Sequence, residues 1–190
     1  MMTPQIITSR TNDKIKQAVK LNDRREREAL RLFRFEGVKL LCEYLAAGMT
    51  ASSIFVRDDV YDKYAHIAKE SGGDVYIVPA QVYEKLTQES APDGVLCIAP
   101  FCDNVRNGGY YGGGIVLEAL RDSGNVGACL RSAMAFGIKN VYVSADCADI
   151  FSQKTVRSAM GAVFNINITT VSDVPELLKK HMAAGGRCCA

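Results

Sequence analysis

The chain has 190 residues and a formal net charge of +2 at pH 7; 48% of its residues are hydrophobic and 23% are charged. This balance is typical of a globular protein of one or two domains with a filled core. No apolar run approaches the roughly 18 residues of a membrane span, and the N-terminus lacks the pattern of a signal peptide, so we expect a cytoplasmic protein.

Positive charge is concentrated at the N-terminus. Residues 1–40, the basic leader, hold ten Lys or Arg and five Asp or Glu, whereas the remainder has an excess of acidic residues. Such an asymmetry favours contact with nucleic acid, and we expect RNA contacts at Arg10, Lys14 and Lys16. The alternative is a solvated helix, because the mixed signs over 24–28 also suit i,i+4 ion pairs.

The first hundred residues alternate between helical and strand-like patterns. This alternation predicts a compact α/β unit over residues 1–100. Its predicted helices are 12–32, with a break near 22–23, then 37–47, 60–70 and 80–88, and its predicted strands are 32–36, 53–56, 75–78 and 94–99.

Residues 101–114 interrupt this alternation. Five of the seven residues in 108–114 are glycine, a composition that predicts a flexible linker. Its two aromatic residues, Tyr110 and Tyr111, either stack on a nucleobase or pack on neighbouring residues.

A second α/β unit is predicted for residues 115–190. Alternating strands and helices favour a parallel sheet, in which functional groups gather beyond the carboxyl ends of the strands. The predicted strands are 115–120, 140–144 and 162–168, and the predicted helices run from a turn at 121–125 to Gly137, over 152–160 and over 173–182.

Polar residues that follow the predicted strand ends are candidates for a functional site. Asn125 is expected to cap the first helix, and Arg131 is expected to lie over Gly127, where its guanidinium would reach toward the helix start and favour an anion. The alternative is a surface ion pair of Arg131 with Asp122 or Glu118.

Lys154 and Arg157 form a second candidate pair. They are three residues apart and therefore share a helical face, so they could bind a phosphate together. The alternative is that they are two exposed basic residues without a ligand.

Cysteine and histidine give little support to other chemistry. The seven cysteines include no C-x-x-C pair, and only His66 and His181 could assist them. A zinc site or a hydrolase with a histidine base is therefore not expected.

Two ordered motifs resemble those of the SpoU (TrmH-like) RNA methyltransferases of the SPOUT superfamily. The first is Asn125-x-Gly127-x-x-x-Arg131, followed by Ala135-Phe-Gly137, and the second is the segment 152–164. The opening segment 7–16 and the triplet at 35–37 are similar to the family's N-terminal RNA-binding domain. The resemblance implies an L30e-like RNA substrate-binding domain over 1–100, a Gly-rich linker over 101–114 and a SPOUT-type parallel-sheet α/β methyltransferase domain over 115–190.

The resemblance also implies a reaction and its participants. The reaction is methyl transfer from S-adenosylmethionine to a ribose 2′-hydroxyl of rRNA or tRNA, with Asn125 and Arg131 as catalytic residues and a homodimer as the full-length assembly. Arg10, Lys14, Lys16, Lys154 and Arg157 are the expected RNA contacts.

The family's third motif has no counterpart in this sequence. We therefore expect a domain truncated before the trefoil knot is complete, with cofactor-binding residues beyond Ala190 and weak cofactor binding by these 190 residues.

Two alternatives remain at this stage. Gly124-x-x-Gly127 and Asp146 loosely imitate a dinucleotide-binding enzyme, although the glycine fingerprint is incomplete. The basic leader alone would also suit a non-catalytic RNA-binding protein.

Overall fold

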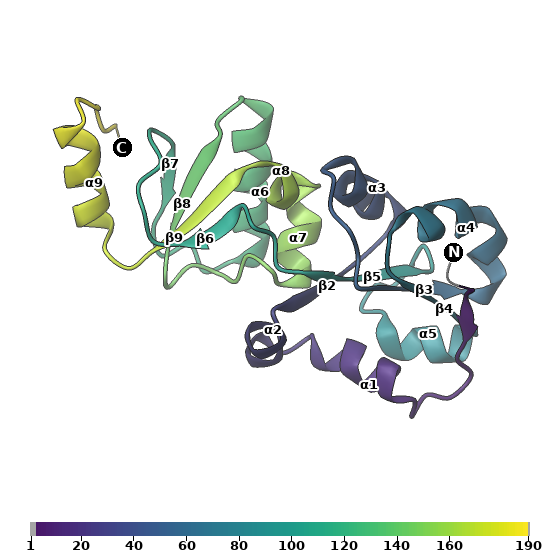
Figure 1. The fold of residues 1–190 in the computed structure, drawn as a ribbon. Coiled ribbons are helices and arrows are strands. Elements are labelled where there is room, and N and C mark those ends of the chain that lie inside the picture. Colours follow the sequence, from purple (N-terminus) through teal and green to yellow (C-terminus); the bar gives the residue numbers. More distant parts are fainter. Residues whose placement is uncertain (1–2, 190) are drawn as a thin grey trace. The chain divides into compact units, whose positions relative to one another are not determined.

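The computed structural model describes residues 3–189. The chain divides into two compact units (Figure 1). Unit 1 comprises Met1–Phe101 and the short segment Phe151–Gln153, and unit 2 comprises Cys102–Ile150 and Lys154–Ala190.

Unit 1 is built on a five-stranded mixed sheet with the order β1-β4-β3-β5-β2. β4 pairs in parallel with β1 and β3, whereas β5 pairs antiparallel with β3 and β2. The strands are β1 (Gln5–Ile6), β2 (Leu32–Glu36), β3 (Ser53–Arg57), β4 (Asp74–Val78) and β5 (Val95–Pro100).

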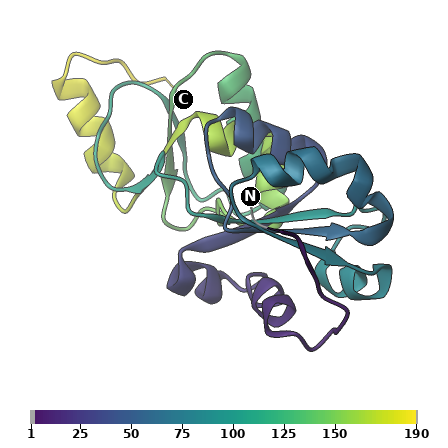
Figure 2. The same ribbon diagram turned by 45° about the vertical axis from the view of Figure 1, so that its right-hand side comes forward.

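Helices cover both faces of this sheet, with α1 and α5 on one face and α3 and α4 on the other (Figures 1 and 2). The break expected near residues 22–23 is confirmed, because Asp23 caps a separate helix by accepting from the backbone N–H of Arg25. The helices are α1 (Asp13–Lys20), α2 (Arg24–Leu30), α3 (Val38–Ala46), the 3₁₀ turn η1 (Asp58–Val60), α4 (Tyr61–Glu70) and α5 (Ala80–Leu86).

A buried ion pair lies within unit 1. The guanidinium of Arg34, which is 1% exposed, is 3.2 Å from Glu36 and also donates to the carbonyls of Ala18 and Leu86. Glu36 in turn accepts hydrogen bonds from Thr87 Oγ1 at 2.6 Å and from Gln153 Nε2 at 2.7 Å. These partners offset much of the cost of burying the two charges, although Arg34 Nε has no hydrogen-bond partner among the described residues.

Unit 2 contains a four-stranded, all-parallel sheet with the order β6-β9-β8-β7. Figures 1 and 2 show α9 on one face and α6, α7 and α8 on the other. The elements are β6 (Val105–Asn107), β7 (Ile115–Leu117), α6 (Ser123–Ala135), β8 (Asn140–Ser144), α7 (Gln153–Ala159), α8 (Ala162–Asn165), β9 (Asn167–Val171) and α9 (Val174–Ala183).

The segment predicted as a linker differs from that expectation. β6 lies within it and pairs in parallel with β9, and the preceding Asn104 donates to the carbonyls of Val163 and Ile166. The glycine run that suggested flexibility follows this strand and does not include it.

Two predicted strands also have different bounds. Ala162–Asn165 forms α8, and the strand begins only at Asn167. A continuous apolar run cannot distinguish a buried strand from a buried helical turn, and Ala162, Val163 and Phe164 are all buried. β7 ends at Leu117, because Ala119 adopts a left-handed φ of 53° that an extended strand does not allow.

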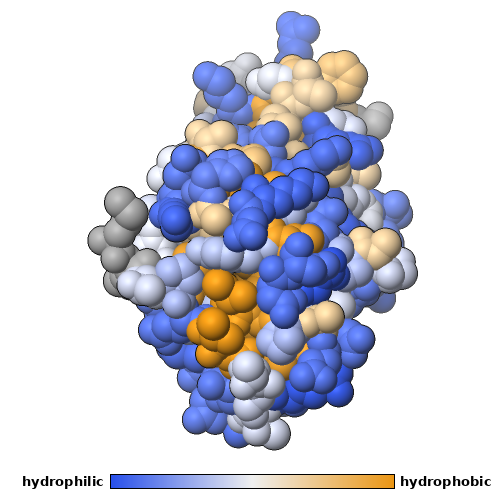
Figure 3. Space-filling model, turned by 90° about the vertical axis from the view of Figure 1, so that its right-hand side faces the viewer, coloured by the Kyte–Doolittle hydropathy of each residue, from blue (hydrophilic) through white to orange (hydrophobic). Residues whose placement is uncertain are grey.

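Hydrophilic side chains cover most of the face seen in Figure 3, and hydrophobic side chains among them gather most densely in its lower half. Such a face is suited mainly to contact with water. In the part of the chain that the structure describes, no helix combines the length and apolar character needed to cross a membrane.

Candidate active site

The turn between β7 and α6 is held by residues that follow β8. The backbone N–H of Ala119 donates to Ser144 Oγ at 2.9 Å, and that of Leu120 points to Cys147 Sγ at 3.3 Å. Ser144 donates to Asp146 Oδ1 at 2.6 Å, which holds the pKa of Asp146 below its ordinary value. This turn fixes where α6 begins, at the carboxyl ends of β7 and β8.

Asp122, and not Asn125 as predicted, caps α6. Its Oδ1 accepts from the backbone N–H of Asn125 at 2.9 Å, so Asn125 lies within the first helical turn. Asp122 directly precedes the first helical residue, Ser123, which is the position of an N-cap. The side chain of Asn125 is exposed beside the positive end of the helix.

Gly127 serves a different purpose from the one expected. A Cβ at this position would lie 2.6 Å from both Ser158 Cβ and the carbonyl oxygen of Thr155. The missing side chain therefore allows α6 and α7 to approach each other, and does not make room for Arg131. Ser158 Oγ also donates to the carbonyl of Gly124 at 2.7 Å, so the two motif helices are joined directly.

Lys154 joins the same two helices. Its Nζ is 2.7 Å from Asp122 Oδ2, and this hydrogen bond is the main reason that the pKa of Asp122 lies below its ordinary value. Lys154 and Arg157 are both exposed on α7. The start of α6 therefore brings together Asp122, Asn125 and Lys154.

Arg131 is exposed on α6, six residues after Asn125. Six residues correspond to about 240° around a helix, so the two side chains do not share a face. Among residues 3–189, Arg131 has no side-chain hydrogen bond and no ion pair. The surface pairing considered as an alternative is not present, since Asp122 pairs with Lys154.

The three leader residues expected to contact RNA have different surroundings. Arg10 donates to the carbonyl of Gln81 at 2.6 Å and pairs with Glu84 at 3.0 Å, and Lys16 pairs with Asp13 at 3.1 Å. The ammonium of Lys14 lies 5.8 Å from the centre of the Tyr76 ring. All three are exposed, but two of them share their charge with a carboxylate.

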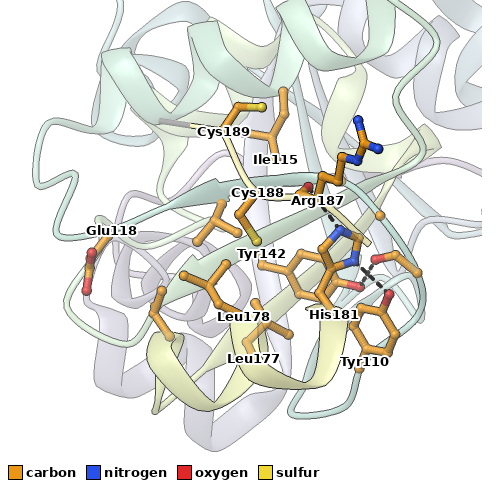
Figure 4. A pocket seen from close by; sticks show the side chains of 15 residues that line it. Tyr110, Ile115, Glu118, Tyr142, Leu177, Leu178, His181, Arg187, Cys188 and Cys189 are labelled. Atoms are coloured by element: carbon orange, nitrogen blue, oxygen red, sulfur yellow. Dashed lines mark hydrogen bonds between the residues drawn. The ribbon is translucent and has the colours of Figure 1, made fainter. Parts of the chain in front are cut away.

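A cavity of about 500 Å³ lies in unit 2 along β7 and α9 (Figure 4). Its polar wall includes Tyr110 and His181, whose Oη and Nδ1 atoms are 2.8 Å apart. Tyr110 also stacks on Tyr142 and therefore packs on neighbouring residues. The adjacent Tyr111 is 48% exposed.

This cavity has the volume of a small-molecule site. However, neither Asn125 nor Arg131 lines it. The described residues also contain no group of three or more His, Cys, Asp or Glu side chains that could hold a metal ion.

Two family models match the chain. Residues 12–97 match the MRM3-like substrate binding domain, and residues 114–190 match the SpoU rRNA Methylase family.

Curated relatives match over most of the chain. An uncharacterized tRNA/rRNA methyltransferase of Synechocystis is 30% identical over 94% of this chain and 67% of its own length. The 23S rRNA (guanosine(2553)-2′-O)-methyltransferase RlmP of Bacillus subtilis is 27% identical over 94% of this chain and 70% of its own length.

Solved structures match the fold. The AdoMet-bound rRNA methyltransferase of Sinorhizobium meliloti has a TM-score of 0.75 and 26% identity, covering 95% of this chain and 69% of that protein. An RNA 2′-O ribose methyltransferase has a TM-score of 0.77 and 26% identity, covering 95% of this chain and 70% of that protein.

Proposed function

The chain belongs to the SpoU rRNA methylase family and is an S-adenosylmethionine-dependent RNA 2′-O-methyltransferase, and we propose that Asn125 and Arg131 are its catalytic residues. The resemblance inferred from the motifs is thus confirmed, and the dinucleotide-binding alternative is set aside. The RNA is an rRNA or a tRNA.

The reaction sets two requirements for the protein. The cofactor supplies a methyl group on a sulfonium, and the ribose 2′-oxygen must approach that carbon in line, so positioning contributes much of the rate. The hydroxyl proton must also leave, and negative charge then develops on the 2′-oxygen. A preorganised positive group at that oxygen stabilises this charge.

Arg131 suits the electrostatic role better than the role of a base. A guanidinium keeps its proton in proteins, so its deprotonation near neutral pH is costly. Its planar fork can instead hold the phosphate next to the reacting ribose and stabilise the emerging alkoxide. The observation that carries this proposal is that Arg131 is exposed on α6 without any acceptor among residues 3–189.

Asn125 and the basic residues are assigned supporting roles. Asn125 lies in the first turn of α6, where it can orient the ribose beside the positive helix end. Lys154 and Arg157 on α7 contact RNA phosphates, and Lys154 exchanges its Asp122 partner for a phosphate when RNA binds. Arg10, Lys14 and Lys16 extend the contact on unit 1. The protein acts in the cytoplasm as a homodimer.

Substitution of Arg131 tests this proposal. Arg131→Ala and Arg131→Lys in the intact protein should both abolish methyl transfer, because a point charge does not reproduce the planar fork. The measurement is incorporation of tritiated methyl groups into RNA. Lys179→Ala is the matched control, since it removes an exposed positive charge from α9 without altering α6. Near-normal incorporation by Arg131→Ala would exclude a catalytic role, and RNA binding without any incorporation by the wild type would favour a non-catalytic RNA-binding protein.

A further inference from the structure

Arg31 has an unusual backbone conformation. It ends α2 with φ 56° and ψ 34°, which is the left-handed region. Glycine is the usual residue at such a helix end, because a side chain destabilises this conformation. A non-glycine residue that persists there points to a use for its side chain.

The side chain of Arg31 lies on an aromatic stack within unit 1. Its guanidinium carbon is 4.7 Å from the centre of the Phe101 ring. Phe101 in turn stacks on Phe151 with centroids 4.0 Å apart and an angle of 16° between the rings, and Phe151 contacts Phe33 at 4.9 Å. The backbone N–H of Phe101 donates to the carbonyl of Arg31 at 2.9 Å, so the arginine and the ring are held together.

The donors of Arg31 are free within the described chain. Arg31 is exposed, and over residues 3–189 no carboxylate or carbonyl accepts from its guanidinium. Arg10 and Arg24 are paired with glutamates, and Arg27 and Arg34 are buried. Arg25 is exposed like Arg31 but has no aromatic ring beneath it among the described residues. Arg31 therefore combines an open charge with a position over an aromatic ring.

We propose that Arg31 is a stacking platform for one unpaired nucleotide of the RNA. The guanidinium carbon lies over the Phe101 ring, so the side of the guanidinium that points away from the ring can accept a nucleobase, while its N–H groups donate to a phosphate. A base inside a duplex cannot reach such a face, so the site selects single-stranded RNA. This inference rests on the proposed RNA methyltransferase function and adds the form of RNA that unit 1 recognises.

The test compares two RNA probes by fluorescence anisotropy, a labelled single-stranded oligonucleotide and the perfect duplex of the same sequence. Arg31→Gly should weaken binding of the single strand by about tenfold, the loss typical of one stacked base. Binding of the duplex should change far less. The same variant should raise the Tm, because glycine relieves the left-handed strain. A merely structural arginine would not give this combination of higher stability and weaker binding.

Two further variants separate stacking from charge. Arg31→Lys should keep the salt dependence of the wild type but not its single-strand affinity, because an ammonium cannot form a planar platform. Arg25→Gln removes an exposed arginine from the same helix without an aromatic support, and should leave the preference for single-stranded RNA unchanged.

Unchanged single-strand affinity of Arg31→Gly would overturn the inference, and so would an equal loss for both probes. Neither result would bear on the catalytic role proposed for Arg131, because that role is tested separately by incorporation of tritiated methyl groups. A wild-type chain that binds neither probe would overturn the inference and also contradict RNA binding itself.

Discussion

At the scale of single residues, Gly127 illustrates what a motif can and cannot predict. The motif drew attention to Gly127, but the reason expected from the sequence was room for the side chain of Arg131. The neighbour that excludes a side chain is α7, whose Thr155 and Ser158 lie against it. The residues in contact are 28 and 31 positions apart in the sequence, so no local pattern could have indicated it.

Gly127→Ala should therefore destabilise the protein. The added Cβ would lie 2.6 Å from the carbonyl oxygen of Thr155, and backbone atoms of two helices must move to accommodate it. Overpacking of this kind typically costs about 1–3 kcal/mol, measured by urea denaturation. Gly113→Ala is the control, because its nearest contact is 3.7 Å away. Equal stability of Gly127→Ala and wild type would mean that α6 and α7 are not closely packed there.

At the scale of helices and strands, the sequence predicts element type better than element bounds. The helices of unit 1 and the strand β8 follow their patterns closely. The bounds of β7 and β9 were wrong because both depend on left-handed residues, Ala119 and Gly161, whose conformations tertiary contacts fix. The N-cap was misassigned to Asn125 because Asp122 and Asn125 are both good capping residues.

Asp122 should make the stability of this helix junction pH-dependent. Its pKa in the folded state is lowered, mainly by the hydrogen bond from Lys154. A lowered pKa means that the carboxylate stabilises the fold above the unfolded pKa of about 3.9 and loses this effect as pH falls through the folded value. Asp122→Asn, which keeps an amide cap but removes the charge, should lower the Tm slightly at pH 7. Because the pair is exposed, the effect is small and is screened by salt.

The comparison at low pH is the internal control for this prediction. Wild type and Asp122→Asn should have the same Tm once the carboxyl group is protonated, well below pH 3.9. A difference in Tm that stays constant from pH 7 to pH 2 would show that charge is not the cause.

At the scale of the whole molecule, motif order predicted the family, the α/β class and the chemistry. The all-parallel sheet of unit 2 follows from the alternation of strands and helices. The stack of Arg31 on Phe101 and Phe151 was not predicted, because it joins residues 120 positions apart. The charge counts predicted RNA contacts at Arg10 and Lys16, but in the structure these residues form ion pairs with Glu84 and Asp13.

This protein is assigned the methylation of a ribose 2′-oxygen. The most direct measurement is to label rRNA and tRNA with tritiated S-adenosylmethionine and the protein, and then to hydrolyse the RNA in alkali. Alkaline cleavage requires a free 2′-hydroxyl as the attacking group, so a methylated ribose protects the adjacent phosphodiester. We predict that the label is recovered in alkali-resistant dinucleotides. Recovery of the label in single nucleotides would place the methyl group on a base and contradict methylation of the ribose.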